Sequence, residues 1–156
     1  MAKRGKAVQF SRTGNPAEVV ELVDINEPDP VSGNILCRIE AAPIAPSHIL
    51  KLSGAYGEHP DLPAIPGNDA LATVVEVGPD VTRFAIGDQL LLPHGSGGWR
   101  QFSSVNASDV NISFPPDGDP LQLSMLLANP PTAYPVSYTH LRAHETREDL
   151  VCRLLL

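Results

Sequence analysis

The chain has 156 residues, of which 42% are hydrophobic and 19% are charged, with 12 Gly and 16 Pro. This composition fits about one globular domain, and no apolar run approaches the roughly 20 residues that a membrane-spanning helix needs. With 11 Lys and Arg against 18 Asp and Glu, the formal charge of -7 argues against a nucleic acid or an anionic membrane as the main partner. We therefore expect small-molecule ligands.

The elements predicted in chain order are mostly short strands, separated by turns that are rich in Gly and Pro. Alternating apolar residues and β-branched runs such as LATVVEV indicate strands that pack as a barrel. The predicted strands are Lys6–Phe10, Ala17–Ile25, Ile35–Ala42, Leu71–Val77, Gln89–Leu92 and Trp99–Val105. The sequence thus predicts a mainly β fold with short helices.

Two helices are expected among these strands. The first covers Ser47–Leu52, because Pro46 suits an early helix position and Gly54 suits a helix end. The second has Asp119 as its cap and carries apolar residues over Pro120–Leu127.

The cysteines indicate the compartment. Cys37 and Cys152 are too few for a disulfide framework, which favours a reducing environment. The opening MAKRGKAVQF passes from basic residues directly into an apolar alternation, without a signal-peptide pattern. We therefore expect a cytoplasmic protein.

The last 21 residues, 136–156, differ in character from the rest of the chain. Read back into codons, 136–146 and 149–156 fit two pieces of a transposon sequencing adapter in one frame, separated by an index-length gap. We interpret this tail as translated adapter and give no functional weight to its potential metal ligands, which are His140, His144, Glu145 and Cys152. A short amphipathic C-terminal helix is the alternative.

A catalytic zinc needs three protein ligands and an open position. His48, His59 and His94 are separated from one another in sequence, and outside the tail only Cys37 could supply a thiolate. We expect no metal site, and we expect these histidines on the surface or in turns. The GSGG stretch at 95–98 lacks the GxGxxG pattern of a dinucleotide loop, so a flexible turn is the favoured interpretation.

Tyr56 is the residue that most suggests chemistry. It lies between two glycines in the polar loop SGAYGEHP, outside any apolar strand pattern, and could face a cleft. A tyrosine holds its proton at neutral pH and can donate it to a developing carbanion or enolate. A packing role is the alternative.

The ordered series AAPIAPSHILKLSGAYG, LPAIPGND, VVEVGPDVTRFAIGDQLL, GGWRQF and LANPPTAY covers nearly all of Lys6–Tyr134. It resembles the medium-chain dehydrogenase/reductase superfamily, in particular its zinc-free enoyl thioester reductases and quinone oxidoreductases. The resemblance implies a GroES-like, partly open β-barrel over 1–118 as the substrate domain. A helix over 119–135 would then lead into a Rossmann domain that this chain does not contain.

The stretches PIAPSH, SGAYG, PGNDA, GGWR and ANPPTAY are similar to motifs of the mitochondrial 2-enoyl thioester reductases. By position, Tyr56 would donate a proton to Cα after NADPH delivers hydride to Cβ of an enoyl-CoA or enoyl-ACP thioester. Asn129 would contact the nicotinamide side of NADPH, and Thr132 would line the cofactor cleft. Trp99 would lie near the substrate cleft, with burial as a packing aromatic as its alternative.

Departures from these motifs leave two alternatives open. Ala45 stands where the reductases have asparagine and His48 where they have aspartate, so NADPH-dependent reduction of a quinone or enone is the rival activity. Zinc-dependent relatives have a cysteine and a GHE motif where this chain has Ala45 and residues 67–69. A non-catalytic GroES-like binding module is the alternative from another class. The resemblance also implies a homodimer for the full-length protein and an inactive fragment.

Overall fold

The structure is a computed structural model that describes residues 3–27, 29–57, 59–111, 113–114 and 118–139. By contacts, the chain divides into two compact units, Met1–Met125 and Leu126–Leu156. Most of the tail interpreted as translated adapter, including all four of its potential metal ligands, lies outside the described residues.

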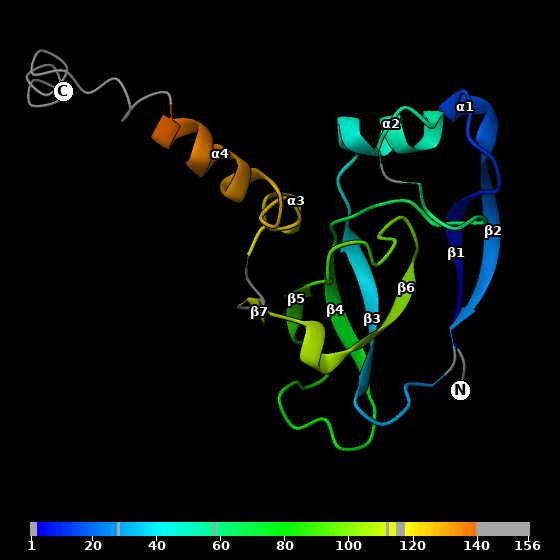
Figure 1. Ribbon diagram of the computed structural model, residues 1–156. Helices are drawn as coiled ribbons and strands as arrows, with labels where there is room; N and C mark the ends of the chain where they lie inside the picture. The colour runs from blue at the N-terminus through cyan, green and yellow to red at the C-terminus, as the bar shows by residue number, and fades with distance from the viewer. Residues whose placement is uncertain (1–2, 28, 58, 112, 115–117, 140–156) are drawn as a thin grey trace, which may run out of the picture. The chain divides into compact units, whose positions relative to one another are not determined.

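The first sheet of the larger unit is a two-stranded antiparallel ribbon (Figure 1). Strand β1 (Lys3–Phe10) pairs with β2 (Val20–Glu27) along their whole lengths, from Lys3 opposite Glu27 to Phe10 opposite Val20. Strand β1 begins at Lys3, three residues earlier than the predicted strand Lys6–Phe10.

Helix α1 (Pro16–Val19) corrects the strand predicted from Ala17. The Asn15 side chain accepts a hydrogen bond from the Ala17 N–H at 3.3 Å, and Pro16 occupies the first turn. This capping gives one helical turn before the β-branched residues of β2 begin. The local cap therefore outweighs the strand preference of the residues that follow it.

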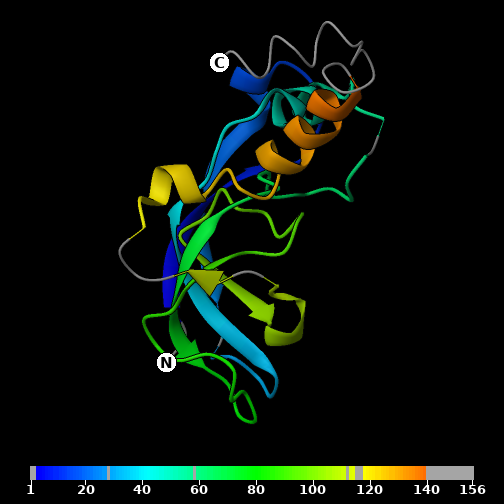
Figure 2. The same cartoon turned by 90° about the vertical axis from the view of Figure 1, so that its left-hand side faces the viewer.

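The second sheet has five antiparallel strands in the order β6-β3-β4-β5-β7. Its central strands β3 and β4 run side by side in both views (Figures 1 and 2), and Ile35 of β3 lies opposite both Val77 and Val105. The strands are β3 (Asn34–Ala41), β4 (Leu71–Val77), β5 (Gln89–Leu91), β6 (Phe102–Asn106) and β7 (Ser113–Phe114). The 3₁₀ helix η1 (Ala107–Asp109) follows β6.

The main hydrophobic core belongs to this second sheet. Its buried members are Ile35, Cys37, Ala70, Ala72, Val74, Phe84, Leu90, Leu92, Val105, Ala107 and Val110. Burial raises the pKa of the Cys37 thiol to about 12, so this cysteine is a packing residue and not a nucleophile at neutral pH.

Main-chain hydrogen bonds join the ribbon to two residues outside the strands of the second sheet, and a smaller core forms around Phe10 of β1. The Phe10 N–H donates to the Ala64 carbonyl at 3.0 Å, and the Val8 N–H donates to the Trp99 carbonyl at 2.9 Å. The buried members of the smaller core are Phe10, Val19 and Leu52. The mainly β, GroES-like prediction is confirmed, with sheets that are not closed into a barrel among the described residues.

Helix α2 (Pro46–Ser53) confirms the first predicted helix. Gly54 ends it in the left-handed region, with φ of 80°, and its N–H turns back to the carbonyls of Leu50 and Lys51. A side chain at this φ would be strained, which explains why glycine ends the helix here.

The predicted second helix is wrong in its extent. Helix α3 is only Pro120–Leu123, although its cap is confirmed because the Asp119 carboxylate accepts from the Leu121 N–H at 3.0 Å. In the smaller unit, α4 (Asn129–Ser137) starts separately, with Pro130 and Pro131 in its first turn. Proline has no N–H to continue a helix from the preceding turn, so one helix over 119–135 does not form.

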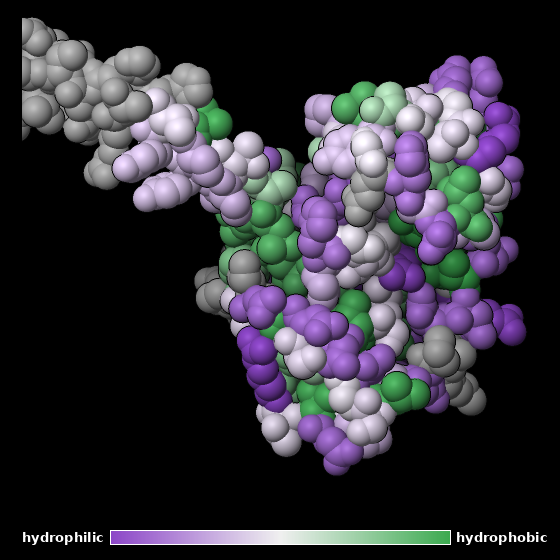
Figure 3. Space-filling model, viewed as in Figure 1, coloured by the Kyte–Doolittle hydropathy of each residue, from purple (hydrophilic) through white to green (hydrophobic). Residues whose placement is uncertain are grey.

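The surface of the larger unit is mixed in polarity. In the view of Figure 3, purple and green residues alternate over most of the face, and the largest continuous green area lies at and below α3. On α3 itself, Leu121 is 69% exposed. No described helix has the length and apolar character that crossing a membrane requires.

Candidate functional site

The candidate site is built from helix α2, residues 66–69 and the turn 94–99, which we call the site region. His48 is in the first turn of α2 and is only 1% exposed, so the prediction of a surface or turn position for it is wrong. Its helical position turns the ring back over Ala45 at the start of the helix, and residues 66–69 cover the other side. His59 and His94 are exposed, as predicted.

The His48 ring lies between two main-chain N–H groups. Nδ1 is 3.1 Å from the Ala45 nitrogen and Nε2 is 3.1 Å from the Asn68 nitrogen. A neutral imidazole can accept one of these bonds at a time, whereas an imidazolium can accept neither. Burial lowers the pKa of His48, Asp69 opposes this effect, and the charges of Lys51 and His94 add to it. The ring is therefore held in its neutral form.

Trp99 packs beside this histidine. Its ring meets the His48 ring edge-on, with centroids 5.5 Å apart, and its Nε1–H donates to the Pro43 carbonyl at 3.2 Å. It also packs against the smaller core. The predicted strand from Trp99 is wrong in its start, because the Trp99 N–H bonds to the Pro66 carbonyl and β6 begins only at Phe102.

Gly67 allows this close approach. Its φ is +99°, and a Cβ at this position would lie 2.7 Å from Trp99 Cδ1. Trp99 therefore has a packing role, which was the alternative interpretation of this residue. Its contact with a substrate stays a prediction.

Asp69 brings a carboxylate into the same region. It is 4% exposed, and its Oδ1 atom has no hydrogen bond and lies 3.5 Å from Nδ1 of the exposed His94. Asp69 has no predicted role, because the residues around it in the sequence give no sign that its side chain is enclosed.

Tyr56 stands outside both cores. It is 37% exposed, and its main-chain N–H donates to the Leu50 carbonyl at 3.2 Å, which fixes the loop to the end of α2. The Lys51 ammonium lies 5.4 Å from the centroid of the Tyr56 ring, and Lys51 Nζ is 3.4 Å from the Asn68 side-chain oxygen. The phenol is thus accessible and has a positive charge over its ring.

A cavity of about 200 Å³ opens beside His48, Lys51 and Asn68. Its polar lining comes from His48, Lys51, His59 and Asn68, and its apolar lining includes Phe10 and Ile65. A few polar groups on an apolar wall are typical of a site for a small organic ligand.

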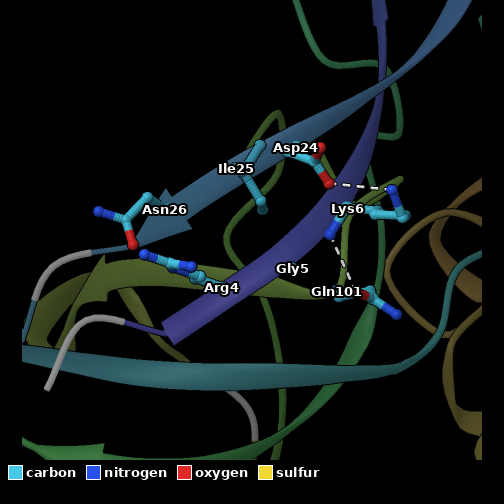
Figure 4. Close-up of a pocket in the computed structure, with 7 residues that line it drawn as sticks. All are labelled: Arg4, Gly5, Lys6, Asp24, Ile25, Asn26 and Gln101. Atoms are coloured by element: carbon cyan, nitrogen blue, oxygen red, sulfur yellow. Dashed lines mark hydrogen bonds and ion pairs between the residues drawn. The ribbon is translucent and has the colours of Figure 1, made fainter.

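A larger cavity, of about 580 Å³, lies over β1 and β2 away from these residues. Its polar groups bind one another: Lys6 Nζ lies 2.9 Å from Asp24 Oδ1, and the Lys6 N–H donates to Gln101 Oε1 at 2.9 Å (Figure 4). These bonds tie β1 to β2 and to the residue before β6. Lys6, Asp24 and Gln101, which line this cavity, hold the strands together and are not free to bind a ligand. Its larger volume therefore does not make it the candidate site.

The predicted cofactor residues are in the smaller unit. Asn129 begins α4 and is exposed, and Thr132 donates its hydroxyl hydrogen to the Ala128 carbonyl at 2.7 Å. Their contact with NADPH stays a prediction. Within the described part of the chain, no three His, Cys, Asp or Glu residues are grouped in a way that could hold a metal ion.

Residues 31–110 match the family model of the alcohol dehydrogenase GroES-like domain. The chain belongs to this family. The match covers four strands of the five-stranded sheet, β3 to β6, and the whole site region, so the predicted resemblance to the medium-chain dehydrogenase/reductase superfamily is confirmed.

Known proteins similar to this chain include members of both predicted branches. The mitochondrial enoyl-[acyl-carrier-protein] reductase of Homo sapiens is 38% identical over 133 residues, which are 84% of this chain and 35% of the human protein. The chain thus spans about a third of the length of this relative.

Two solved structures are similar in fold. One is a complex of Etr1p with NADP and crotonyl-CoA, with a TM-score of 0.77, 25% identity, and coverage of 88% of this chain and 44% of that chain. The other is a Bacillus thuringiensis protein assigned as an NADPH:quinone reductase, with a TM-score of 0.74, 29% identity, and coverage of 89% and 41%.

Proposed function

We propose that this chain is the substrate-binding part of an NADPH-dependent oxidoreductase that reduces the C=C bond of a 2-enoyl thioester. The observation that carries the proposal is the accessible Tyr56 ring after α2, over which lies Lys51, a residue that lines the cavity of the site region. The similarity to the human enoyl reductase and to the crotonyl-CoA complex supports the same substrate class.

In this proposal Tyr56 is the general acid. Addition of hydride at Cβ moves the C=C electron pair toward Cα and the thioester carbonyl. The Tyr56 O–H bond then breaks as the Cα–H bond forms, and the phenolate takes a proton from water. The exposed position of the ring allows both the substrate and the water to reach the hydroxyl. General-acid catalysis of this kind contributes about 10²- to 10⁴-fold.

NADPH supplies the hydride when it is bound. Asn129 has an exposed carboxamide, whose donor and acceptor suit the nicotinamide carboxamide, and Thr132 lies one turn along the same helix face. These two residues would contribute contacts to the nicotinamide side. The rest of the cofactor would bind to a Rossmann domain outside this chain.

Reduction of a quinone by NADPH is the second candidate. The Bacillus thuringiensis structure favours it, as do Ala45 and His48, whose side chains differ in hydrogen-bonding capacity from the asparagine and aspartate of the enoyl reductase motif. A quinone takes its hydride and proton without a proton donor aimed at a carbon atom. The two activities therefore differ in their need for the Tyr56 hydroxyl.

The test is turnover of NADPH by the full-length product of the gene, with crotonyl-CoA and with a soluble quinone as substrates. The proposal expects faster turnover of crotonyl-CoA and none by the 156-residue chain alone, because without the cofactor domain the phenol has no positioned hydride to follow. Preference for the quinone would select the second candidate. A gene that ends soon after Tyr134, as read by long-read sequencing, would select the binding module.

The remaining expectations are part of the same proposal. We propose a homodimer for the full-length protein and a cytoplasmic location. Size-exclusion chromatography with light scattering and imaging of a tagged protein would check them.

A further inference from the structure

Lys51 places a positive charge over the ring of the candidate proton donor. The ammonium lies 5.4 Å from the Tyr56 ring centroid, within the range of about 6 Å at which a cation and an aromatic ring attract each other. The two side chains lie close together because the Tyr56 N–H donates to the Leu50 carbonyl, which brings the loop back to the last turn of α2.

The position of Lys51 is fixed by a second contact. Its ammonium nitrogen is 3.4 Å from the Asn68 side-chain oxygen. Asn68 is itself held, because its main-chain nitrogen is 3.1 Å from Nε2 of the buried His48. We call the series His48, Asn68, Lys51 and Tyr56 the polar chain. It connects a buried anchor to an exposed phenol.

Other charged groups near the polar chain do not replace Lys51. Asp69 is buried beside His94 and His48, and the exposed His59 lines the same cavity. In the described part of the chain, Lys51 is the cation that stacks on Tyr56.

We propose that Lys51 is a positioning residue for Tyr56, held by Asn68 and, through it, by His48. This inference rests on the proposed function. When Tyr56 gives its proton to Cα, negative charge appears on the phenol, and the ammonium above the ring stabilises that charge without transferring a proton itself. Lys51 also restricts the directions in which the ring can turn.

We therefore expect Lys51 to affect the rate of the chemical step and not the binding of the substrate. In the full-length enzyme, Lys51→Met should lower kcat for crotonyl-CoA about tenfold, with KM changed less than about twofold, as expected for a group felt mainly in the transition state. Lys51→Arg keeps the charge and should retain most of kcat. Lys6→Met, which removes one charge from β1, is the matched control and should leave both constants unchanged.

A double-mutant cycle with Tyr56→Phe tests whether Lys51 acts through Tyr56. Lys51→Met should cause no further loss of kcat in the Tyr56→Phe enzyme, because the group it assists is gone. Losses that multiply would overturn the inference, and so would a Lys51→Met enzyme with raised KM and unchanged kcat. Circular dichroism of each variant checks that the fold is retained.

The outcomes separate this inference from the proposed function. If the wild-type enzyme does not turn over crotonyl-CoA, the proposed function fails. If the wild type is active and Tyr56→Phe has a lowered but measurable kcat, but the two losses multiply, only the role of Lys51 fails.

Discussion

The core of the five-stranded sheet and the site region differ in what they bury. The core encloses aliphatic side chains such as Ile35 and Leu90, with no exposed surface. The site region encloses an imidazole and a carboxylate, and it contains a glycine with a left-handed backbone. Burying a polar group costs stability unless it is paired, and in the site region this cost applies to Asp69, whose Oδ1 atom has no hydrogen bond.

The largest effect on stability is expected in the core. Leu90→Ala should lower the free energy of unfolding of the 156-residue chain by about 2–5 kcal/mol, because it removes buried methyl groups and leaves a cavity. Urea denaturation followed by circular dichroism measures it. Leu22→Ala is the control, because Leu22 is 68% exposed and its loss should matter little. Equal losses of unfolding free energy in the two variants would contradict the expected difference between a buried and an exposed leucine.

Tyr56→Phe should have the largest effect on activity. In the full-length enzyme it should lower kcat for crotonyl-CoA by roughly 10²-fold or more, because the general acid is lost. The thermal midpoint should stay close to that of the wild type, since the ring is kept and is 37% exposed. Retained activity would leave Tyr56 with a packing role only.

Gly67→Ala tests how tightly the site region is packed. Both Gly67 and Gly87 have φ of +99°, but a Cβ at Gly67 would lie 2.7 Å from Trp99 Cδ1, whereas a Cβ at Gly87 meets nothing within 4 Å. Both alanine variants carry backbone strain, and only Gly67→Ala adds overpacking, of about 1–3 kcal/mol. The difference between their free energies of unfolding measures how tightly Gly67 packs against the Trp99 ring and against the main-chain nitrogens of Gly98 and Trp99, which would each lie 2.9 Å from such a Cβ. Equal losses would mean that the ring and this turn have room to move.

The smallest expected effect is a dependence of stability on pH. The pKa of His48 in the folded chain is below its ordinary value of 6.5. As the pH falls below 6.5, the unfolded chain binds a proton at this residue before the folded chain does, so the folded state loses stability until the lower, folded pKa is passed. Above pH 6.5 this contribution is constant.

His48→Gln should make the free energy of unfolding less dependent on pH over this window. His59→Gln, at an exposed position, is the control and should leave the dependence unchanged. An unaltered pH profile in His48→Gln would show that protonation of this ring is not linked to folding.

Local signals in the sequence predicted much of the fold. The proline and glycine that bound α2 specify that helix, and Leu71–Val77 is a strand with the bounds that its β-branched run predicts. The cap at Asp119 was also recognisable. The Asn-Pro cap of α1 is an equally local signal, but the strand-forming residues that follow it favour a strand from Ala17.

The environment of the site was not predictable from local signals. The burial of His48 depends on Asn68, which is 20 positions away in the chain, and on Trp99, which comes later still. No periodicity near His48 indicates that these segments meet over its ring. Tyr56 could be singled out because its exposure follows from the glycines beside it, whereas the charge above it required the folded loop.

The position of Trp99 has a practical consequence. The chain contains one tryptophan, and its ring meets that of His48 edge-on at the candidate site. Its fluorescence is therefore a label-free optical signal from one known place. Occupation of the neighbouring cavity, displacement of the turn that carries Trp99, or protonation of the imidazole would each alter the emission, so ligands could be screened on the unmodified chain without an enzyme assay.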